Sequence, residues 1–230
     1  MPFVVYDIRQ EHETAKQYAY RTIRRNIMFL DMLPGEAVLE KEMAGSMGVS
    51  RTPVREALLE LEHEHLIDIF PQRGTRVSLL DGNMVDQGRF LRSTVEMAVL
   101  EIDCANVPTQ KFLDDLDLNL KEQAELAATK NLYGFFAKDS EFHKILFTAA
   151  GKEMIYDLIS VYIPHFHRER MLRLQMFDPT ELLHDHMQIT QSIRNKDCRS
   201  AQLYMKRHLD RVICDQKILK EAFPAYFSLG

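Results

Sequence analysis

The chain has 230 residues, of which 46% are hydrophobic, so it can bury the core of one large or two modest domains. Its formal net charge of −5 excludes binding to nucleic acid through bulk basic character, so any such binding must depend on individually placed residues. Three scattered cysteines exclude a disulfide framework, and no run approaches the ~20 apolar residues of a membrane span, so we expect a soluble, cytoplasmic protein without a membrane partner.

Three helices are predicted in the first 66 residues. One follows the apolar spacing of residues 20–30 and ends before the turn in LPGEAV, and a short one covers LEKEMAGSM and stops at Gly48. The third begins at Ser50 or Thr52 in SRTPVREALLELEHEHL, where apolar residues recur at i, i+3, i+4 and i+7. Two short helices joined by a glycine turn are typical of the helix-turn-helix, whose second helix reads a DNA groove.

Arg51 and Arg55 lie on the predicted solvent side of the third helix, in its first turns. Cations are mildly unfavourable there, because the helix dipole places partial positive charge at this end. Solvated surface charge is the simpler alternative, but the positions one turn from Arg55 hold Leu58, Leu59 and Arg51 and no acid. A bound polyanion is therefore the better interpretation.

Residues 66–80 predict a β-hairpin. LIDIF and TRVSLL have the composition of short strands, PQRG supplies a turn, and Arg73 and Arg76 lie at or beside its tip. Three helices followed by a hairpin give the winged-helix order, so we assign residues 1–80 to a winged helix-turn-helix DNA-binding domain. A small helical cap with surface arginines is the alternative, but it leaves the arginines of the first turn and of the hairpin tip unexplained.

This region resembles the N-terminal domain of GntR-family transcriptional regulators over nearly its whole length. The motifs PG, E-x-E-x-A, GVSRTPVREAL and RG-x-x-V occur in order in LPGEAVLEKEMAGSMGVSRTPVREALLELEHEHLIDIFPQRGTRV. The resemblance implies contacts to double-stranded operator DNA from Lys41, Ser50, Arg51, Thr52 and Arg55 and, in the wing, from the region of Arg73 and Gly74. Arginine can bond guanine O6 and N7 in a bidentate manner, worth roughly 1 to 3 kcal/mol of discrimination. The chain departs from the family at His65, where glycine is common.

From Asp81 onward the pattern is helical, without a convincing strand. We expect helices at about 82–104, 108–129, 131–149, 152–176, 180–195 and 198–222, separated by VPT, Gly151, FDPT and RNKD. They predict an antiparallel six-helix bundle in residues 81–230. The expected fold class is therefore mostly α: a winged helix-turn-helix followed by an all-α bundle.

Within the bundle, the helix around FFAKDSEFHKILF carries Asp139 and His143 on its apolar face. Burying both is costly unless they are paired or bind a metal, and a hydrogen bond between them would be the commoner explanation for this pair alone. His186 and His208 also fall on inward faces of two later helices. One acid and three imidazoles predict a site for a divalent transition metal, most simply Zn, with Ni, Mn or Fe also compatible.

Two alternatives to this ligand set stay open. Any one inward histidine could be a core residue with a hydrogen-bond partner. His165 and His167, in IPHFHRER, are the nearest competitors as ligands, although their H-x-H spacing splits them across a helix.

The same region resembles the FCD ligand-binding domain of the FadR-type branch of that family, over roughly residues 85–217. The resemblance implies metal ligands at Asp139, His143, His186 and His208, the positions of a D-x-x-x-H helix and of one histidine in each of the last two helices. It also implies a small carboxylate effector. Arg92 and Glu96, in RFLRSTVEM, match the family's R-x-x-x-E and are the expected effector-binding residues; a surface Arg–Glu pair is the equally supported alternative.

These interpretations together predict a sequence-specific transcriptional regulator, a repressor in the first place, and not an enzyme. It would act as a homodimer on a palindromic operator, under the control of a small organic acid bound near the metal. A metal-dependent hydrolase that carries a DNA-binding domain is the alternative, but no general base and no H-E-x-x-H motif is evident. A structural DNA-binding protein without an effector would not need the inward polar residues.

Overall fold

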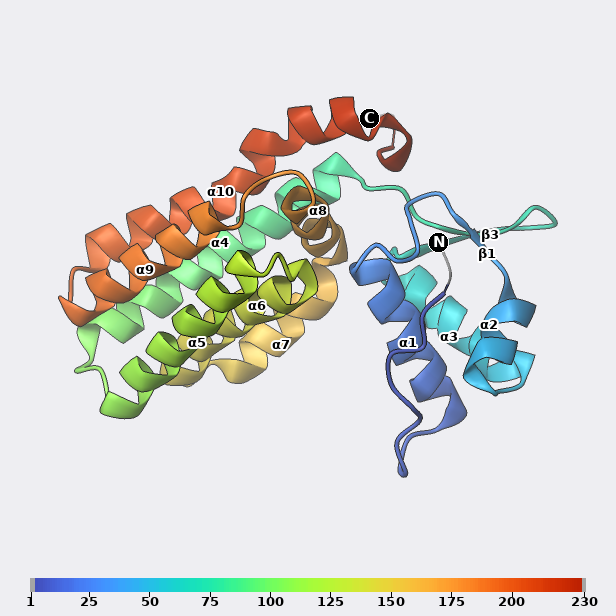
Figure 1. The fold of residues 1–230 in the computed structure, drawn as a ribbon, viewed down its shortest axis with the longest axis horizontal. Coiled ribbons are helices and arrows are strands. Elements are labelled where there is room, and N and C mark those ends of the chain that lie inside the picture. The colour runs from blue at the N-terminus through green and yellow to red at the C-terminus, as the bar shows by residue number, and fades with distance from the viewer. Residues whose placement is uncertain (1–2, 229–230) are drawn as a thin grey trace.

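The computed structural model describes residues 3–228, and within that range it contains ten α-helices, one short 3-10 helix and a three-stranded sheet. The fold is mostly α. The first six elements lie at one end of the molecule and the later helices form a long bundle at the other end (Figure 1). Over the described range, none of the helices combines the length and the apolar character that a bilayer crossing requires.

The N-terminal elements form a winged helix. In chain order they are α1 (Ala15–Met28), β1 (Ala37–Val38), α2 (Glu40–Met47), α3 (Arg51–His63), β2 (Ile67–Phe70) and β3 (Gly74–Val77). The strands form an antiparallel sheet in the order β1-β3-β2, in which Ile67 pairs with Val77 and Phe70 with Gly74. The predicted helices and hairpin are present, and β1 is a third strand that was not expected from the sequence.

Local sequence explains where these helices begin and end. Thr14 caps the N-terminus of α1: its side chain accepts the N–H of Gln17, while the Gln17 side chain accepts the N–H of Thr14. α2 ends at Gly48, which has φ 65°. His65, just after α3, has φ 58°, the conformation that makes glycine suitable at this position. α1 packs on α3 through fully buried apolar residues: Ile23, Ile27, Val54, Leu58 and Leu61.

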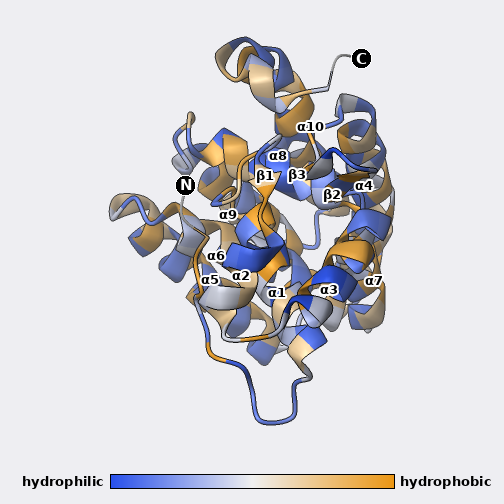
Figure 2. Cartoon of the chain, turned by 90° about the vertical axis from the view of Figure 1, so that its right-hand side faces the viewer, coloured by the Kyte–Doolittle hydropathy of each residue, from blue (hydrophilic) through white to orange (hydrophobic). Residues whose placement is uncertain are grey.

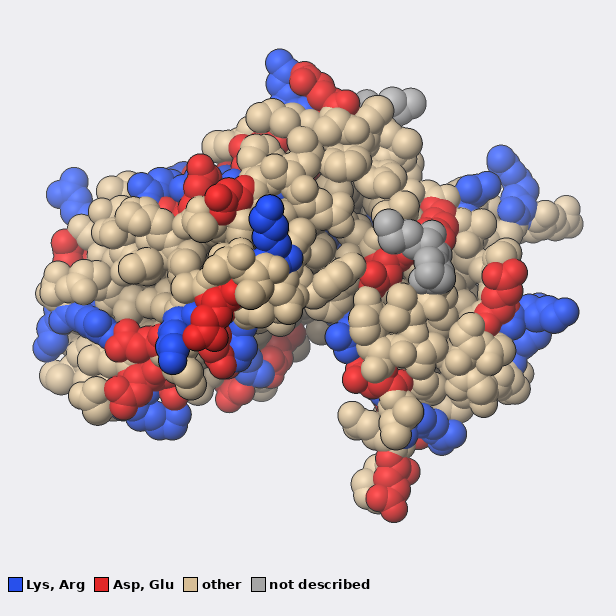
Figure 3. Space-filling view, in the orientation of Figure 1, with Lys and Arg blue, Asp and Glu red and all other residues tan. Residues whose placement is uncertain are grey.

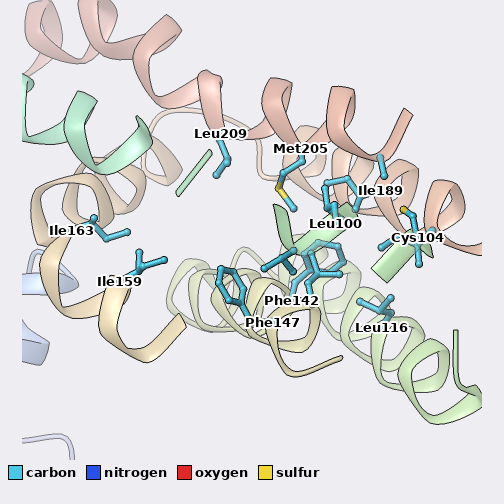
Figure 4. Close-up of a cluster of buried hydrophobic side chains, with 14 of the residues drawn as sticks. Leu100, Cys104, Leu116, Phe142, Phe147, Ile159, Ile163, Ile189, Met205 and Leu209 are labelled. Atoms are coloured by element: carbon cyan, nitrogen blue, oxygen red, sulfur yellow. The ribbon is translucent and has the colours of Figure 1, made fainter. Parts of the chain in front are cut away.

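The C-terminal helices are α4 (Gly82–Ala105), α5 (Gln110–Ala128), α6 (Leu132–Ala149), α7 (Glu153–Tyr162), α8 (Pro164–Leu174), α9 (Thr180–Arg194) and α10 (Cys198–Ala222), followed by η1 (Pro224–Tyr226). α10 packs along α4 and α9, and α5 pairs with α6. Figure 4 shows side chains that fill the space between them, such as Leu100, Phe142, Ile189 and Met205. Polar and apolar residues alternate around most helices, as expected of amphipathic helices that share a core (Figure 2).

The prediction of a single helix over residues 152–176 was wrong, because the chain forms two helices there. α7 ends at Tyr162 and α8 begins at Pro164, since proline has no N–H to continue the hydrogen-bond ladder and its ring clashes with the preceding turn. Ile163 between them has φ −119° and ψ 42°, outside the helical region. In the part of the chain that is described, the bundle therefore has seven helices rather than six.

Candidate metal centre and nucleic-acid interface

Four buried side chains from three helices converge inside the bundle. α6 contributes Asp139 and His143, one turn apart, while α9 contributes His186 and α10 contributes His208. Each offers one ligand atom, and these atoms all lie within 4.8 Å of one another. The four residues predicted as metal ligands are therefore brought together at one point.

The three imidazoles turn their Nε2 atoms toward one another. The Nε2 atoms of His143 and His208 are 3.2 Å apart, and those of His186 and His208 lie 3.9 and 4.0 Å from Asp139 Oδ1. The buried Nε2 of His186 has no hydrogen-bond partner among residues 3–228. Zinc–nitrogen bonds of ~2.1 Å in a tetrahedron separate ligand atoms by ~3.4 Å, so the observed separations suit a single ion.

Partners on the far side of two rings set their tautomers. His143 Nδ1 lies 2.7 Å from Glu96 Oε2, and His186 Nδ1 lies 2.9 Å from Gln123 Oε1. Because these oxygens accept, each Nδ1 carries the proton and each Nε2 keeps the lone pair that a metal ion needs. Gln123 in turn donates to Asn119 Oδ1 at 2.6 Å, which orients its amide.

Burial keeps the three imidazoles neutral. It lowers the pKa of His186 to about 3, and it lowers the pKa of His143 and of His208 below the usual value of 6.5. The neutral imidazole is the form that binds metal. The donor set therefore fits a divalent transition-metal ion, and Zn, Ni, Mn and Fe all accept these ligand types.

Arg92 and Glu96, the predicted effector-binding pair, lie beside these rings on α4. Their side chains are only 4% and 2% exposed, and Arg92 Nε donates to Glu96 Oε1 at 2.6 Å, so the alternative of a surface pair was wrong. Burial alone would raise the pKa of Glu96, but Arg92 and His143 lower it to about 2. Arg92 Nη1 is buried without a partner in the described chain, which leaves a donor for an anionic group.

Arg170, on α8, is a functional candidate that sequence reasoning missed. It donates from Nη2 to Asp139 Oδ2 and from Nη1 to His167 Nδ1, the latter at 2.9 Å. Burial would raise the pKa of Asp139, but Arg170 and the neighbouring imidazoles lower it. The residue was missed because the helix break at Pro164 changes the helical phase of everything that follows it.

Gln123 was also missed, although its signal is visible in the sequence. The buried stripe of α5 consists of Phe112, Leu116, Asn119 and Gln123, so two amides continue an apolar face. Polar side chains in such positions need partners. Their presence on the stripe indicates a polar site on the helix that packs against it.

The two competing histidines lie outside the cluster. His165 Nδ1 accepts the backbone N–H of Asp81 at 3.1 Å, and its Nε2 lies 2.9 Å from the His65 carbonyl. His167 bonds to Arg170 rather than facing the other imidazoles. Both histidines are buried, with partners of their own.

One cavity borders the cluster, and a larger cleft lies on the other side of Phe136. The cavity, of about 10 Å³ and lined in part by Asp139, Arg170 and His208, has room for roughly one water molecule. The open cleft, of about 850 Å³, separates α1 from the bundle, with His167 and Phe136 in its wall. Phe136 lines both cavities, so its side chain stands where the cleft and the buried cluster approach each other.

The residues predicted to contact DNA are all exposed. Lys41 lies on α2, Ser50, Arg51, Thr52 and Arg55 lie at the start of α3, and Arg73 and Gly74 lie at the hairpin tip. Ser50 is the N-cap of α3, but its side chain makes no capping hydrogen bond, so its hydroxyl is free for another acceptor. Positive and negative side chains are interspersed over the face seen in Figure 3.

An acid does accompany the two arginines, and it comes from another helix. Glu40, at the start of α2, lies 3.3 Å from Arg51 and 3.1 Å from Arg55. The arginine side chains are 60% and 63% exposed, so these ion pairs contribute at most ~1 kcal/mol and can exchange for phosphate or base contacts. The positions one turn from Arg55 on α3 indeed hold no acid, but the two arginines are nevertheless paired, with Glu40 of α2.

Comparisons with known proteins agree with both parts of the chain. Residues 15–77 match the family of bacterial regulatory proteins described as gntR, and residues 89–211 match the FCD domain. The chain is 30% identical to the HTH-type transcriptional repressor RspR of Escherichia coli K12 over 217 residues, which cover 94% of this chain and 95% of that protein. It is 32% identical to an HTH-type regulator of Streptomyces ambofaciens, over 94% of this chain and 90% of the other. Among solved structures, Escherichia coli McbR/YncC has the same fold, with a TM-score of 0.76 and 16% identity over 92% of this chain and 99% of that one.

Proposed function

The chain belongs to the GntR family of bacterial regulatory proteins and carries an FCD domain, so it is a transcriptional regulator and not an enzyme; on this premise we propose that it is a metal-dependent, effector-controlled repressor. In this proposal residues 1–80 bind the operator and residues 81–230 bind the metal and a small carboxylate. The name of its relative RspR, a transcriptional repressor, supports the direction of regulation. The alternative hypothesis of a metal-dependent hydrolase is rejected, because both matched domains are those of regulatory proteins.

The observation that carries the proposal is the convergence of Asp139, His143, His186 and His208, in which His143 and His186 turn their Nε2 lone pairs inward. These residues would hold the ion. When bound, the ion supplies a Lewis acid to which a carboxylate can add as a further ligand. Arg92 offers its unpartnered Nη1 to the same anion, and charge-assisted bonds of this kind are the stronger class of hydrogen bond.

For DNA binding we propose that the start of α3 enters the major groove and the hairpin enters the minor groove. Arg51 and Arg55 exchange Glu40 for base edges or phosphates, and Ser50, Thr52 and Lys41 contact the backbone. Arg73, beside Gly74 at the tip of the wing, supplies the cation for the minor groove. Symmetric half-sites then require a dimer.

An exposed apolar face supports a homodimer. Phe90, Leu91 and Tyr162 line a groove between α4 and α7, and Met154 and Leu158 extend the same side of α7. All five side chains are exposed, although together they form an unusually apolar surface for a monomer. We assign this apolar face, defined by these five residues, to contact with a second copy of the chain.

The test is elemental analysis of the purified protein against a His143→Ala, His186→Ala, His208→Ala triple variant, with circular dichroism as the check on folding. About one transition-metal ion per chain, lost in a variant that still folds, is the expected result. His184→Ala is the matched control: His184 is exposed on α9, the helix that also carries His186, and this variant should keep the metal. Wild-type protein without metal after reconstitution would leave only the DNA-binding half of the proposal.

A further inference from the structure

α8 is a polar helix that is completely buried. Its sequence PHFHRERMLRL contains two histidines, three arginines and a glutamate, and every one of its residues is buried. Burying ionisable groups costs free energy unless they are bonded. Most buried helices are apolar for this reason, so the composition of α8 indicates a role other than filling the core.

One end of α8 holds the winged helix. His165 Nδ1 accepts the N–H of Asp81, so the proton of the neutral ring is on Nε2, which donates to the His65 carbonyl at 2.9 Å. Arg168 Nη2 donates to the Ser78 carbonyl at 2.7 Å. His65 lies just past the end of α3 and Ser78 directly follows β3, so these two bonds act on the recognition helix and on the wing.

The same helix reaches the four-ligand cluster through Arg170. Its guanidinium bonds Asp139 and His167, and the side chains of Asp139 and Arg170 are 2% and 8% exposed. No solvent layer therefore separates the cluster carboxylate from α8. Any change in the bonding of Asp139 must be accommodated by Arg170, which lies only two residues from Arg168.

The contact between Arg168 and the winged helix is incompletely satisfied. Its Nε and Nη1 are buried without hydrogen-bond partners in the described chain, and only Nη2 bonds, to Ser78. A buried cation with two unbonded donors is costly. A shift of α8 against the winged helix that gives these donors acceptors would offset part of that cost.

We propose that α8 transmits the state of the metal centre to the DNA-binding elements. Arg170 is the contact that senses the centre, and His165 and Arg168 are the contacts that act on α3 and the wing. The inference rests on the proposed function, because it names how that site is coupled to DNA. Coupling of this kind is reciprocal, so DNA binding must also alter affinity at the centre.

Hydrogen exchange with Zn²⁺ as the probe tests this assignment on the full chain. In the wild type, Zn²⁺ should change the exchange of backbone amides around the cluster and also at residues 64–66 and 78–81. In Arg168→Met, which keeps an unbranched apolar stem but removes the donor, zinc should still bind and the change at residues 78–81 should be lost. Arg173→Met is the matched control, because Arg173 is a buried arginine of α8 that bonds Asp215 instead of the winged helix.

His165→Gln provides a second variant if Arg168→Met does not fold, and it should lose the change at residues 64–66. The proposal is overturned if zinc alters exchange only within the bundle of the wild type, or if both variants respond like the wild type. Either result leaves the metal-dependent regulator in place. Failure of the wild type to bind zinc would instead overturn the proposed function together with this inference.

Discussion

At the scale of single residues, two of the three imidazoles, those of His143 and His186, are held by acceptors behind them. Glu96 accepts from His143 and from Arg92 at the same time, one oxygen for each. The carboxylate thereby fixes one ring and balances one buried cation. Such outer partners orient the ligating rings, and removing one typically lowers metal affinity by about 10- to 100-fold.

We therefore predict that Glu96→Gln weakens zinc binding by roughly 10- to 100-fold. The amide lacks the negative charge that holds the Nδ1–H of His143, and it leaves Arg92 buried without a counter-charge. Competition with a chelating indicator measures the affinity. Glu101→Gln, on the exposed side of the same helix, is the control, and equal affinities in the two variants would contradict the role of Glu96.

His165 predicts a pH dependence of stability. Burial, followed by Arg168, lowers its pKa to about 4, against about 6.5 when unfolded. Between pH 6.5 and 4 the unfolded chain therefore binds more protons than the folded one, and the free energy of unfolding falls as the pH falls, by about 1.4 kcal/mol per pH unit for this group. Denaturant unfolding at several pH values should show a smaller slope in His165→Gln; an identical slope would show that this histidine does not titrate as described.

At the scale of elements, α2 and α3 are joined by more than their turn. Glu40 on α2 accepts from both recognition-helix arginines and keeps them extended over the same surface. Burial raises the pKa of Glu40, but Arg55 and Arg51 lower it by more, so the net shift is downward. The pairs are exposed, so their value for folding is small and their value for DNA binding can dominate.

Arg55→Ala should therefore weaken operator binding by about 1 to 3 kcal/mol, roughly 5- to 150-fold, and leave thermal stability nearly unchanged. Fluorescence anisotropy with a DNA fragment selected from a random pool measures the affinity. Arg194→Ala removes an exposed arginine of the bundle, paired with Asp117, and serves as the control. A similar loss in both variants would indicate nonspecific electrostatics instead of groove recognition.

At the scale of the whole molecule, the apolar face of α4 and α7 is the contact that we propose for a second copy of the chain. Tyr162 is 75% exposed, and α7 has only one buried residue, Ile159, although most of its side chains are apolar. A face of this kind is stable in water when another surface covers it. A second copy of the chain would also supply the second half-site reader.

Tyr162→Lys is expected to weaken the proposed dimer by roughly 10-fold or more, because it places a charge in the proposed apolar contact. Sedimentation velocity over a range of concentrations measures the effect. Leu203→Lys, at another highly exposed apolar position, on α10, is the control. Unchanged association in Tyr162→Lys would place the dimer contact elsewhere.

Local patterns were enough to predict most of the elements. The helices, the glycine turn before α3 and the hairpin depend on spacing, capping and turn residues, all of which act within a few positions of the chain. The inward faces of α6, α9 and α10 follow from the same periodicity, so Asp139, His143, His186 and His208 could be grouped before any coordinates were known.

Only the tertiary structure decided which side chains complete these groups. Glu40, Gln123 and Arg170 act on residues of other helices, and helix packing, which local periodicity does not specify, brings them within bonding distance. For the same reason, the sequence could not show whether Arg92 and Glu96 are buried, because an i, i+4 pair has the same spacing on an exposed face and on a buried one. The sequence by itself thus determined the elements and the chemistry of their side chains. Packing decided which partners meet and, by removing water around them, how strongly their charges interact.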